Sequence, residues 1–357
     1  MCWPRIARRR SWRRARIISE RHPAKDPRMT RLLFSLALSL LLASPVSAQV
    51  IKIATLAPDG SAWMRELRAA SAEVKQGTGG RVDVKFYPGG VMGNDAVVLR
   101  KMRLGQLQGG VLTSSELSLV YPDATAYSLP FLMADWDEVA RVRAAVDPLL
   151  AKGFEQRGIR MLGVSGLGFA YLMGDRPLRT KADMAGIKLW IPSNDEIAAR
   201  TFKMGGINTI PLPLGDVFTS LQTGLVDTVV NTPSGAIVLQ WHGKLKHMVD
   251  LPLTFVTGFL VLDEKAWKKI PPADQAVLSA AFDSAGKRMD ANIRRDDAAA
   301  LAAMKKQGIT VGPLEPTEAA RWREYGARVT TQMEAEKAIS PEILAAIRRA
   351  LAQPKAP

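Results

Sequence analysis

The sequence predicts an α/β protein that is large enough for two domains. The chain has 357 residues, of which 47% are hydrophobic and 23% charged, a balance that supports two separate cores. A buried strand (50–55), a helix (61–77) and an alternating strand (81–88) follow one another within about 40 residues, which is typical of a parallel βαβ unit. Between Pro272 and Gly308 the sequence is rich in helix formers, which predicts a single helix of roughly 50 Å.

The N-terminal residues are predicted to lie outside the mature protein. Residues 1–28 carry a net charge of +8 out of the +15 of the whole chain, and we interpret them as an extension in front of the true start at Met29. Residues 29–48 have a basic start, an apolar stretch and a small-residue end, the three parts of a secretory signal peptide. An N-terminal membrane anchor is the alternative. The mature chain is expected to begin at Gln49 and to reside in the periplasm.

The elements of the first part follow from turn and cap residues. Ser61 can cap a helix in which Trp63 and three further apolar residues recur at helical spacing. A glycine-rich loop (89–95) precedes a second helix, which stops at Gly105, and residues 107–112 supply a third strand.

The stretch 187–192 is predicted to be a strand with a large aromatic residue on one face. Three aliphatic residues alternate with Lys188 and Trp190, so the aliphatic side chains point one way and these two the other. A tryptophan is a poor choice for a face open to water. Trp190 therefore faces either a second layer of core or a ligand pocket.

Further elements follow up to the long helix. Asn231 stands at the end of a predicted strand, where an amide side chain often serves as a turn residue. The predicted elements are a strand at 160–165, a helix at 197–202, a short helix at 216–223, a strand at 226–231, a polar helix-like stretch at 241–247 and an apolar strand at 253–262.

The sequence lacks the residues that catalysis or a cofactor would need. The segment Gly163-Val164-Ser165-Gly166-Leu167 misses the last glycine of a nucleophile elbow, and the chain has no phosphate-binding glycine loop. His242 and His247 do not share a helical face, and the lone cysteine, Cys2, lies in the predicted extension. Without residues 1–48 the net charge falls to +6, which is no evidence for nucleic-acid binding. We therefore predict no enzyme activity, no cofactor, no metal and no nucleic-acid partner.

A series of short motifs is spread along the chain in a fixed order. The longest leads from Arg176-Pro177 to Asp183-Met184-Ala185-Gly186-Ile187-Lys188-Leu189-Trp190-Ile191-Pro192. Weaker ones are Pro88-Gly89-Gly90, Arg103-Leu104-Gly105-Gln106-Leu107, Leu129-Pro130-Phe131-Leu132 and Leu221-Gln222-Thr223-Gly224-Leu225-Val226-Asp227. Together they resemble the solute-binding proteins of tripartite ATP-independent periplasmic (TRAP) transporters, of the DctP type.

The resemblance implies a two-lobed α/β fold in which the long helix bridges both lobes. On this basis lobe I is predicted to comprise residues 49–167 plus 257–296, and lobe II residues 168–256 plus 297–357. Such a protein captures a small-molecule ligand by closing its lobes and delivers it to the membrane permease subunits of a TRAP transporter. An envelope lipid carrier or a ligand-sensing subunit with the same fold is the alternative.

Two departures from the family pattern concern the ligand. The family commonly has arginines that bind a carboxylate where this chain has Ala170 and Trp190, and neither residue can replace a bidentate arginine. We therefore predict an apolar or aromatic ligand. The alternative is an ordinary organic acid held by another cation, such as Lys188 or Arg176. The predicted ligand-binding residues are Trp190, Asn231, Phe169, Ala170, Tyr171, Glu116 and Trp63.

Overall fold

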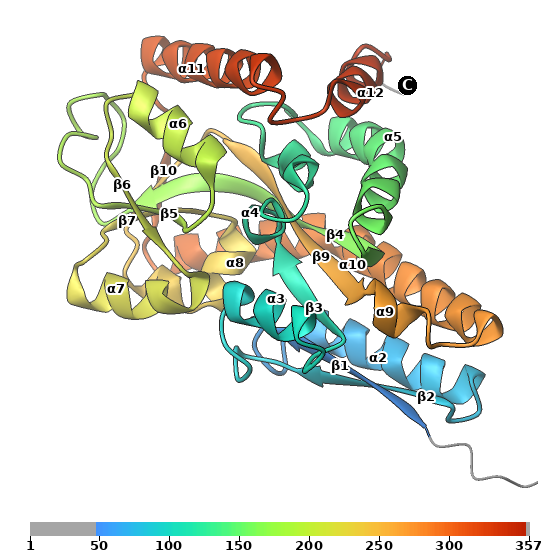
Figure 1. Ribbon diagram of the computed structural model, residues 1–357. Helices are drawn as coiled ribbons and strands as arrows, with labels where there is room; N and C mark the ends of the chain where they lie inside the picture. Colours follow the sequence, from blue (N-terminus) through green and yellow to red (C-terminus); the bar gives the residue numbers. More distant parts are fainter. Residues whose placement is uncertain (1–47, 355–357) are drawn as a thin grey trace, which may run out of the picture. The chain divides into compact units, whose positions relative to one another are not determined.

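The computed structural model describes residues 48–354, so the predicted extension and almost all of the predicted signal segment lie outside the described residues. In the described part, ten strands form one sheet in the order β2-β1-β3-β9-β4-β7-β5-β6, with β8 beside β4 and β10 beside β8 (Figure 1). Helices are interspersed with the strands along the chain, so the fold is α/β, as predicted.

The strands and helices have the following bounds. The strands are β1 (Gln49–Thr55), β2 (Val82–Tyr87), β3 (Gly109–Thr113), β4 (Ile159–Gly174), β5 (Leu189–Pro192), β6 (Thr209–Leu212), β7 (Thr228–Asn231), β8 (His247–Val249), β9 (Thr254–Asp263) and β10 (Thr310–Gly312). The α-helices are α2 (Ala62–Gly77), α3 (Asp95–Arg103), α4 (Ser114–Leu117), α5 (Trp136–Glu155), α6 (Glu196–Met204), α7 (Val217–Thr223), α8 (Pro233–Val238), α9 (Glu264–Trp267), α10 (Pro272–Lys306), α11 (Pro316–Ala335) and α12 (Pro341–Leu351). Short 3-10 helices are η1 (Pro122–Ser128), η2 (Leu214–Asp216) and η3 (Trp241–Gly243).

The βαβ unit predicted at the start of the mature chain is confirmed. β1 pairs in parallel with β2, and α2 connects them. The Ser61 side chain accepts a hydrogen bond from the backbone N–H of Met64 and so caps α2, which buries Leu67 and Val74 against the sheet. β3 also pairs in parallel with β1 and brings its C-terminal end, Thr113, beside the end of β1. The loops that follow the C-terminal ends of these parallel strands therefore lie at the same edge of the sheet.

Strand β4 connects the two parts of the sheet. Its first three quarters, as far as Ala170, pair antiparallel with β9, and from Tyr171 onward it pairs with β7. A register shift between Gly166 and Gly168 marks a bulge. Gly168 has φ +109°, a conformation that residues with a side chain rarely adopt, so glycine is needed there.

The long helix α10 bridges both lobes, as predicted (Figure 1). Near its beginning, Leu278 and Phe282 pack in the same hydrophobic cluster as the buried residues of β1 and α2. Near its end, Met304 packs in another cluster, which contains Trp190 and Trp241. A single helix thus contributes to cores at both ends of the sheet.

The alternation predicted for the strand around Trp190 is also confirmed. Leu189 and Ile191 pack in one cluster with residues of α6 and α11, whereas Trp190 belongs to the cluster on the opposite face. Both faces of β5 are therefore buried.

One predicted element is wrong. The polar helix-like stretch at 241–247 is a short 3-10 helix, η3, followed by strand β8, which begins at His247 and pairs with β4 and β10. Trp241 is only 1% exposed, because its ring packs against Trp190 in the core. The polar residues around it suggested a surface helix, but the single large aromatic decides where the segment lies.

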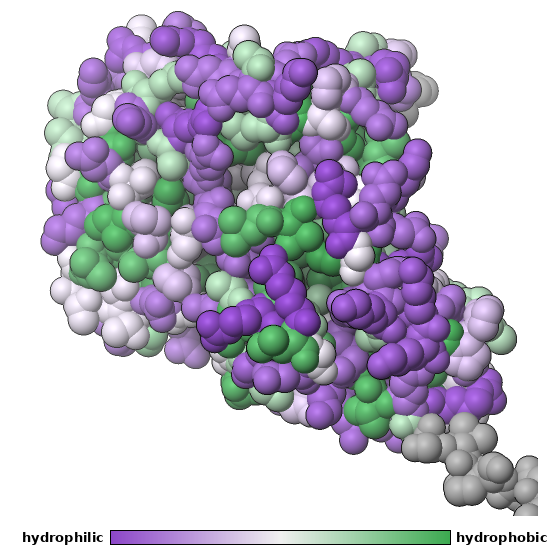
Figure 2. Space-filling view, viewed as in Figure 1, coloured by the Kyte–Doolittle hydropathy of each residue, from purple (hydrophilic) through white to green (hydrophobic). Residues whose placement is uncertain are grey.

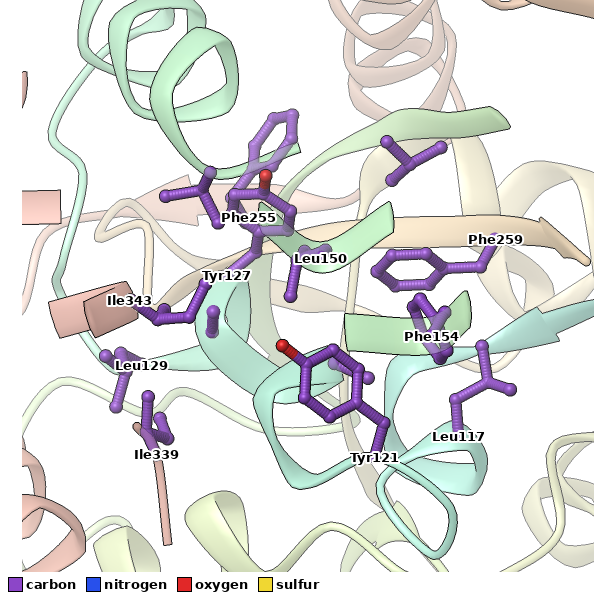
Figure 3. Packing of buried hydrophobic residues seen from close by; sticks show 14 of the residues in the cluster. Leu117, Tyr121, Tyr127, Leu129, Leu150, Phe154, Phe255, Phe259, Ile339 and Ile343 are labelled. Carbon is purple, nitrogen blue, oxygen red and sulfur yellow. The ribbon is translucent and has the colours of Figure 1, made fainter. Parts of the chain in front are cut away.

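The C-terminal helix α12, which is predicted to belong to lobe II, packs against elements of both predicted lobes. Helix α12 contacts α5, and Ile339 and Ile343 join a cluster with Tyr127 and Leu129 (Figure 3). The predicted lobe boundaries stay a prediction.

The face of the described part that Figure 2 shows is mostly polar. On the face shown in Figure 2, hydrophilic residues prevail, and hydrophobic residues gather around the position of α4. Among helices within residues 48–354, none is both long and apolar enough to span a bilayer.

Candidate functional site

A cleft lies where chain segments after β1 and β3 meet the ends of β5, β7 and β9. It has a volume of about 190 Å³, whereas one water molecule needs roughly 10–15 Å³, so a small organic molecule fits. The residues that line the cleft are Leu56, Ala57, Pro58, Trp63, Thr113, Ser114, Ser115, Ser128, Pro130, Phe131, Leu167, Ala170, Trp190, Ile191, Pro192, Asp195, Ile197, Ala198, Thr201, Phe202, Leu214, Val230, Asn231, Thr232, Gly235, Val238, Leu239, Leu253, Thr254, Phe255, Val256, Thr257 and Trp322.

The lining of the cleft contains no lysine, arginine or histidine among these described residues. Its one ionisable side chain is Asp195, whose Oδ1 accepts a hydrogen bond of 2.9 Å from the backbone N–H of Ala198 and so caps α6. Burial raises the pKa of the Asp195 carboxyl, because the charged form loses its hydration. The cleft therefore offers no positive charge to a ligand.

Hydroxyl groups make up one polar part of the lining. The side chains of Ser114 and Ser128 lie 3.2 Å apart, oxygen to oxygen, and share a hydrogen bond. Thr254 donates its hydroxyl to the backbone carbonyl of Tyr127 at 3.1 Å. The hydroxyl of Thr257 is buried and has no hydrogen-bond partner within residues 48–354. A buried hydroxyl without a partner costs free energy, and because this oxygen has no exposed surface, a ligand in the cleft does not reach it.

Trp190 belongs both to the core and to the wall of the cleft. Its indole N–H donates to the backbone carbonyl of Leu212 at 3.0 Å, and its ring meets Trp241 edge-on at 5.2 Å between ring centres. Only 3% of the residue is exposed. The two possibilities that the sequence left open, core packing and pocket lining, thus apply together.

Three further predicted residues line the same cleft. Ala170 is buried on β4, and Trp63 stands in the first turn of α2. Asn231 ends β7, and its Oδ1 accepts a hydrogen bond of 2.8 Å from the backbone N–H of Thr232, which is the turn role expected for such a residue. The structure thus brings these three together with Trp190.

The remaining predicted residues lie elsewhere. Phe169 packs between the rings of Trp136 and Phe255, at 5.4 and 5.3 Å between ring centres, and does not line the cleft. Tyr171 is half-buried on the same strand, and burial raises its pKa to about 12. Glu116 accepts a hydrogen bond of 2.8 Å from the side-chain amide of Asn194, in a smaller pocket next to the cleft. Ligand contact by any of the predicted residues stays a prediction.

The two cations considered as substitutes for the family's arginines point away from the cleft. Arg176 is exposed and pairs with Asp175 and Asp227 at 3.1 and 2.9 Å. The ammonium group of Lys188 donates to the backbone carbonyl of Gly224 at 2.8 Å. Neither side chain is part of the cleft lining.

Sequence reasoning missed several lining residues. Asp195 carries the helix-cap signal of an acidic residue before α6, but nothing in the sequence indicates that α6 begins at the cleft. Trp322 comes from α11, which packs against α6. Thr257 gives no signal, because its missing partner is a property of the folded chain alone.

The fold and the cleft define a protein that encloses a small molecule between two lobes. The chain belongs to the bacterial extracellular solute-binding proteins of family 7, the DctP family, whose family model matches residues 53–337. This confirms the resemblance, and the members of the family are transport proteins rather than enzymes.

Individual relatives agree with this assignment. The chain is 27% identical over 331 residues to the C4-dicarboxylate-binding periplasmic protein DctP of Rhodobacter capsulatus, covering 89% of this chain and 96% of the relative. It is 23% identical to the sialic acid-binding periplasmic protein SiaP of Vibrio cholerae, covering 77% and 86%.

Solved structures share the fold. A TRAP periplasmic solute-binding protein from Desulfovibrio salexigens with bound orotic acid superposes with a TM-score of 0.79 at 22% identity, covering 85% of this chain and 99% of that one. DctP7 of Bordetella pertussis, a receptor binding pyroglutamic acid, gives a TM-score of 0.79 at 21% identity, covering 84% and 100%.

Proposed function

We propose that this protein binds a neutral, largely apolar or aromatic small molecule and delivers it to the membrane subunits of a TRAP transporter. The single observation that carries the ligand class is the absence of any cationic side chain in the lining of the cleft, all of which lies in the described residues. The named ligands of the relatives above are acids. A carboxylate in this cleft would have no arginine to pair with and would face the Asp195 carboxyl.

An apolar ligand gains its affinity in a different way. Ring and aliphatic surface is offered to the cleft by Trp63, Trp190, Phe202 and Leu239. Each Å² of apolar area that is removed from water contributes about 25 cal/mol, so burying one ring of the ligand contributes a few kcal/mol. The side-chain amide of Asn231 can then set the orientation of the ligand through a neutral hydrogen bond.

The ligand class is tested with pairs of molecules that differ in charge alone. The secreted protein is purified without added ligand, examined by native mass spectrometry, and then titrated by calorimetry at pH 7 with benzamide and with benzoate. We expect benzamide to bind and benzoate to bind at least tenfold more weakly, and we expect C4-dicarboxylates to release no heat. Tighter binding of benzoate, or a co-purified organic acid, would overturn the proposal.

The delivery step rests on membership of the family. It is tested by ligand uptake in cells that carry the membrane subunits of a TRAP transporter, with and without this protein. Uptake that depends on this protein supports the proposal. A protein that retains its ligand but restores no uptake is instead a carrier or a sensing subunit.

We also propose that residues 29–48 direct export. β1 begins at Gln49, so cleavage after Ala48 would leave every strand intact. The N-terminal mass of the protein recovered from the periplasm tests this, and a mature chain that retains residues 29–48 would contradict it.

A further inference from the structure

A second cavity of about 110 Å³, here called the side chamber, lies between α2 and α10 and borders the cleft. The two cavities have six lining residues in common, among them Trp63, Leu167 and Leu214. Beyond this shared wall the side chamber is bounded mainly by apolar side chains, including Leu260 and Met289. A molecule that fills the cleft thus has an apolar space next to it.

The polar groups in the wall of the side chamber already have partners. The carboxylate of Asp95 accepts hydrogen bonds from the backbone N–H and the hydroxyl of Thr113, each at 2.9 Å. The Thr55 hydroxyl oxygen accepts from the backbone N–H of Ala57 at 3.1 Å, and Ser165 donates to the carbonyl of Gly166 at 3.3 Å. The hydroxyls of Thr55, Thr113 and Ser165 are thus engaged within the protein, and because most of the remaining wall is apolar, the chamber suits an apolar occupant.

Three glycines keep the side chamber open. A Cβ atom placed on Gly286 of α10 would meet no atom within 4 Å, and one on Gly163 or Gly258 would come no closer than 3.9 and 3.8 Å to its nearest neighbour. None of the three has a positive φ, so backbone geometry does not require glycine at these positions. Protein cores are normally packed without such gaps.

We propose that the side chamber receives the distal hydrocarbon part of the ligand, so that this protein binds an elongated molecule with one neutral polar end. This inference rests on the proposed function. The polar end lies in the cleft near the side-chain amide of Asn231, and an unbranched hydrocarbon chain passes Trp63 and Leu214 into the side chamber.

A chain-length series tests the inference. Primary alcohols with about 4 to 10 carbons are titrated by calorimetry into the secreted protein and into the variants Gly286→Leu and Gly258→Val, whose new side chains occupy the chamber from different elements. Gly286→Ala is the matched control, because a single methyl group leaves most of the chamber open. Each buried methylene contributes about 0.8 kcal/mol, which is about fourfold in affinity.

We expect the affinity of the native protein and of Gly286→Ala to rise about fourfold per carbon over the whole series. In the two filled variants the short alcohols should bind as in the native protein, and the rise should stop at a shorter chain. Melting temperatures confirm that each variant is folded. If the affinity of the native protein stops rising at the same alcohol length as that of Gly286→Leu, the proposal that the side chamber binds the hydrocarbon chain is overturned, while the proposed function stays intact. If benzamide and the short alcohols all fail to bind, the proposed function itself fails, and this inference with it.

Discussion

Two threonines of β9 allow the unpaired buried hydroxyl to be tested against a matched control. Thr254 and Thr257 both line the cleft, but Thr254 donates its hydroxyl to the Tyr127 carbonyl, whereas the hydroxyl of Thr257 is buried without a partner among residues 48–354. Valine has nearly the same shape as threonine and lacks the hydroxyl. Thr254→Val therefore removes a hydroxyl that has a hydrogen-bond partner, and Thr257→Val removes one from the same strand that has none.

The expected effects on stability have opposite signs. Thr257→Val removes a buried hydroxyl that has lost its hydration without forming a hydrogen bond in the protein. We therefore expect the free energy of unfolding of the ligand-free protein to rise by about 1–2 kcal/mol. Thr254→Val removes a hydrogen bond and leaves a carbonyl without its donor, so we expect a loss of about 1 kcal/mol. Because one hydroxyl is already bonded and the other has no exposed surface, we expect both variants to bind ligand with nearly the affinity of the native protein.

Urea unfolding of the ligand-free protein, followed by tryptophan fluorescence, measures the stabilities, and calorimetry with benzamide and a primary alcohol measures the affinities. Thr254→Val should leave the affinities within about twofold. A Thr257→Val variant that is less stable than the native protein, to the same extent as Thr254→Val, would refute the reasoning, because the hydroxyl would then have a partner in the unliganded state.

Three further outcomes follow from the structure. Trp190→Phe keeps a ring against Trp241 but loses the hydrogen bond to Leu212, and we expect urea unfolding to show a loss of about 1–3 kcal/mol; a change below about 0.5 kcal/mol would contradict this. Gly168 has a positive φ, and a Cβ at this position would lie 3.1 Å from the Asp297 carboxylate, so Gly168→Ala should lower the free energy of unfolding by about 1–3 kcal/mol. Gly286 lies inside a helix with free space around it, so Gly286→Ala should raise the free energy of unfolding by about 0.5–1 kcal/mol. Equal changes in the two variants would be inconsistent with the bulge geometry. Burial raises the pKa of Asp297 to about 6, so the folded state binds more protons than the unfolded state between about pH 4 and 6. Relative to Asp297→Asn, the native protein should therefore become more stable, by up to about 3 kcal/mol, as the pH falls from 7 to 4, and a parallel pH profile of the two proteins would rule this out.

The elements that the sequence predicts well are those in which neighbouring residues determine the structure. The helix from Pro272, the βαβ unit at the start and the alternation around Trp190 each follow from a local period of apolar residues. The full length of β4 could not be predicted in this way. It changes partners from β9 to β7 at Tyr171, and both partners come from distant parts of the chain.

The candidate site was predictable only in part for the same reason. Trp190, Ala170 and Asn231 stand out because motifs surround them, and all three line the cleft. Phe169 precedes and Tyr171 follows the lining residue Ala170 on β4. A strand turns alternate side chains to opposite faces, so both point away from the side on which Ala170 lies. A motif places a backbone segment at a site, whereas the pleat of the strand decides which side chain enters it.

Introducing an arginine at position 190 alone is not expected to make this cleft a carboxylate site. The indole of Trp190 fills core space beside Trp241 and satisfies the carbonyl of Leu212, with only 3% of the residue exposed. A guanidinium in the same place would be buried without a paired anion and would leave the packing around Trp241 incomplete, a combination that costs several kcal/mol. Ala170 is as deeply buried, at 1% exposure, so a second arginine there meets the same obstacle. The absence of cations from the cleft is therefore built into the packing of β4 and β5 and involves at least two core positions. A change of ligand class would require the surrounding core to change as well.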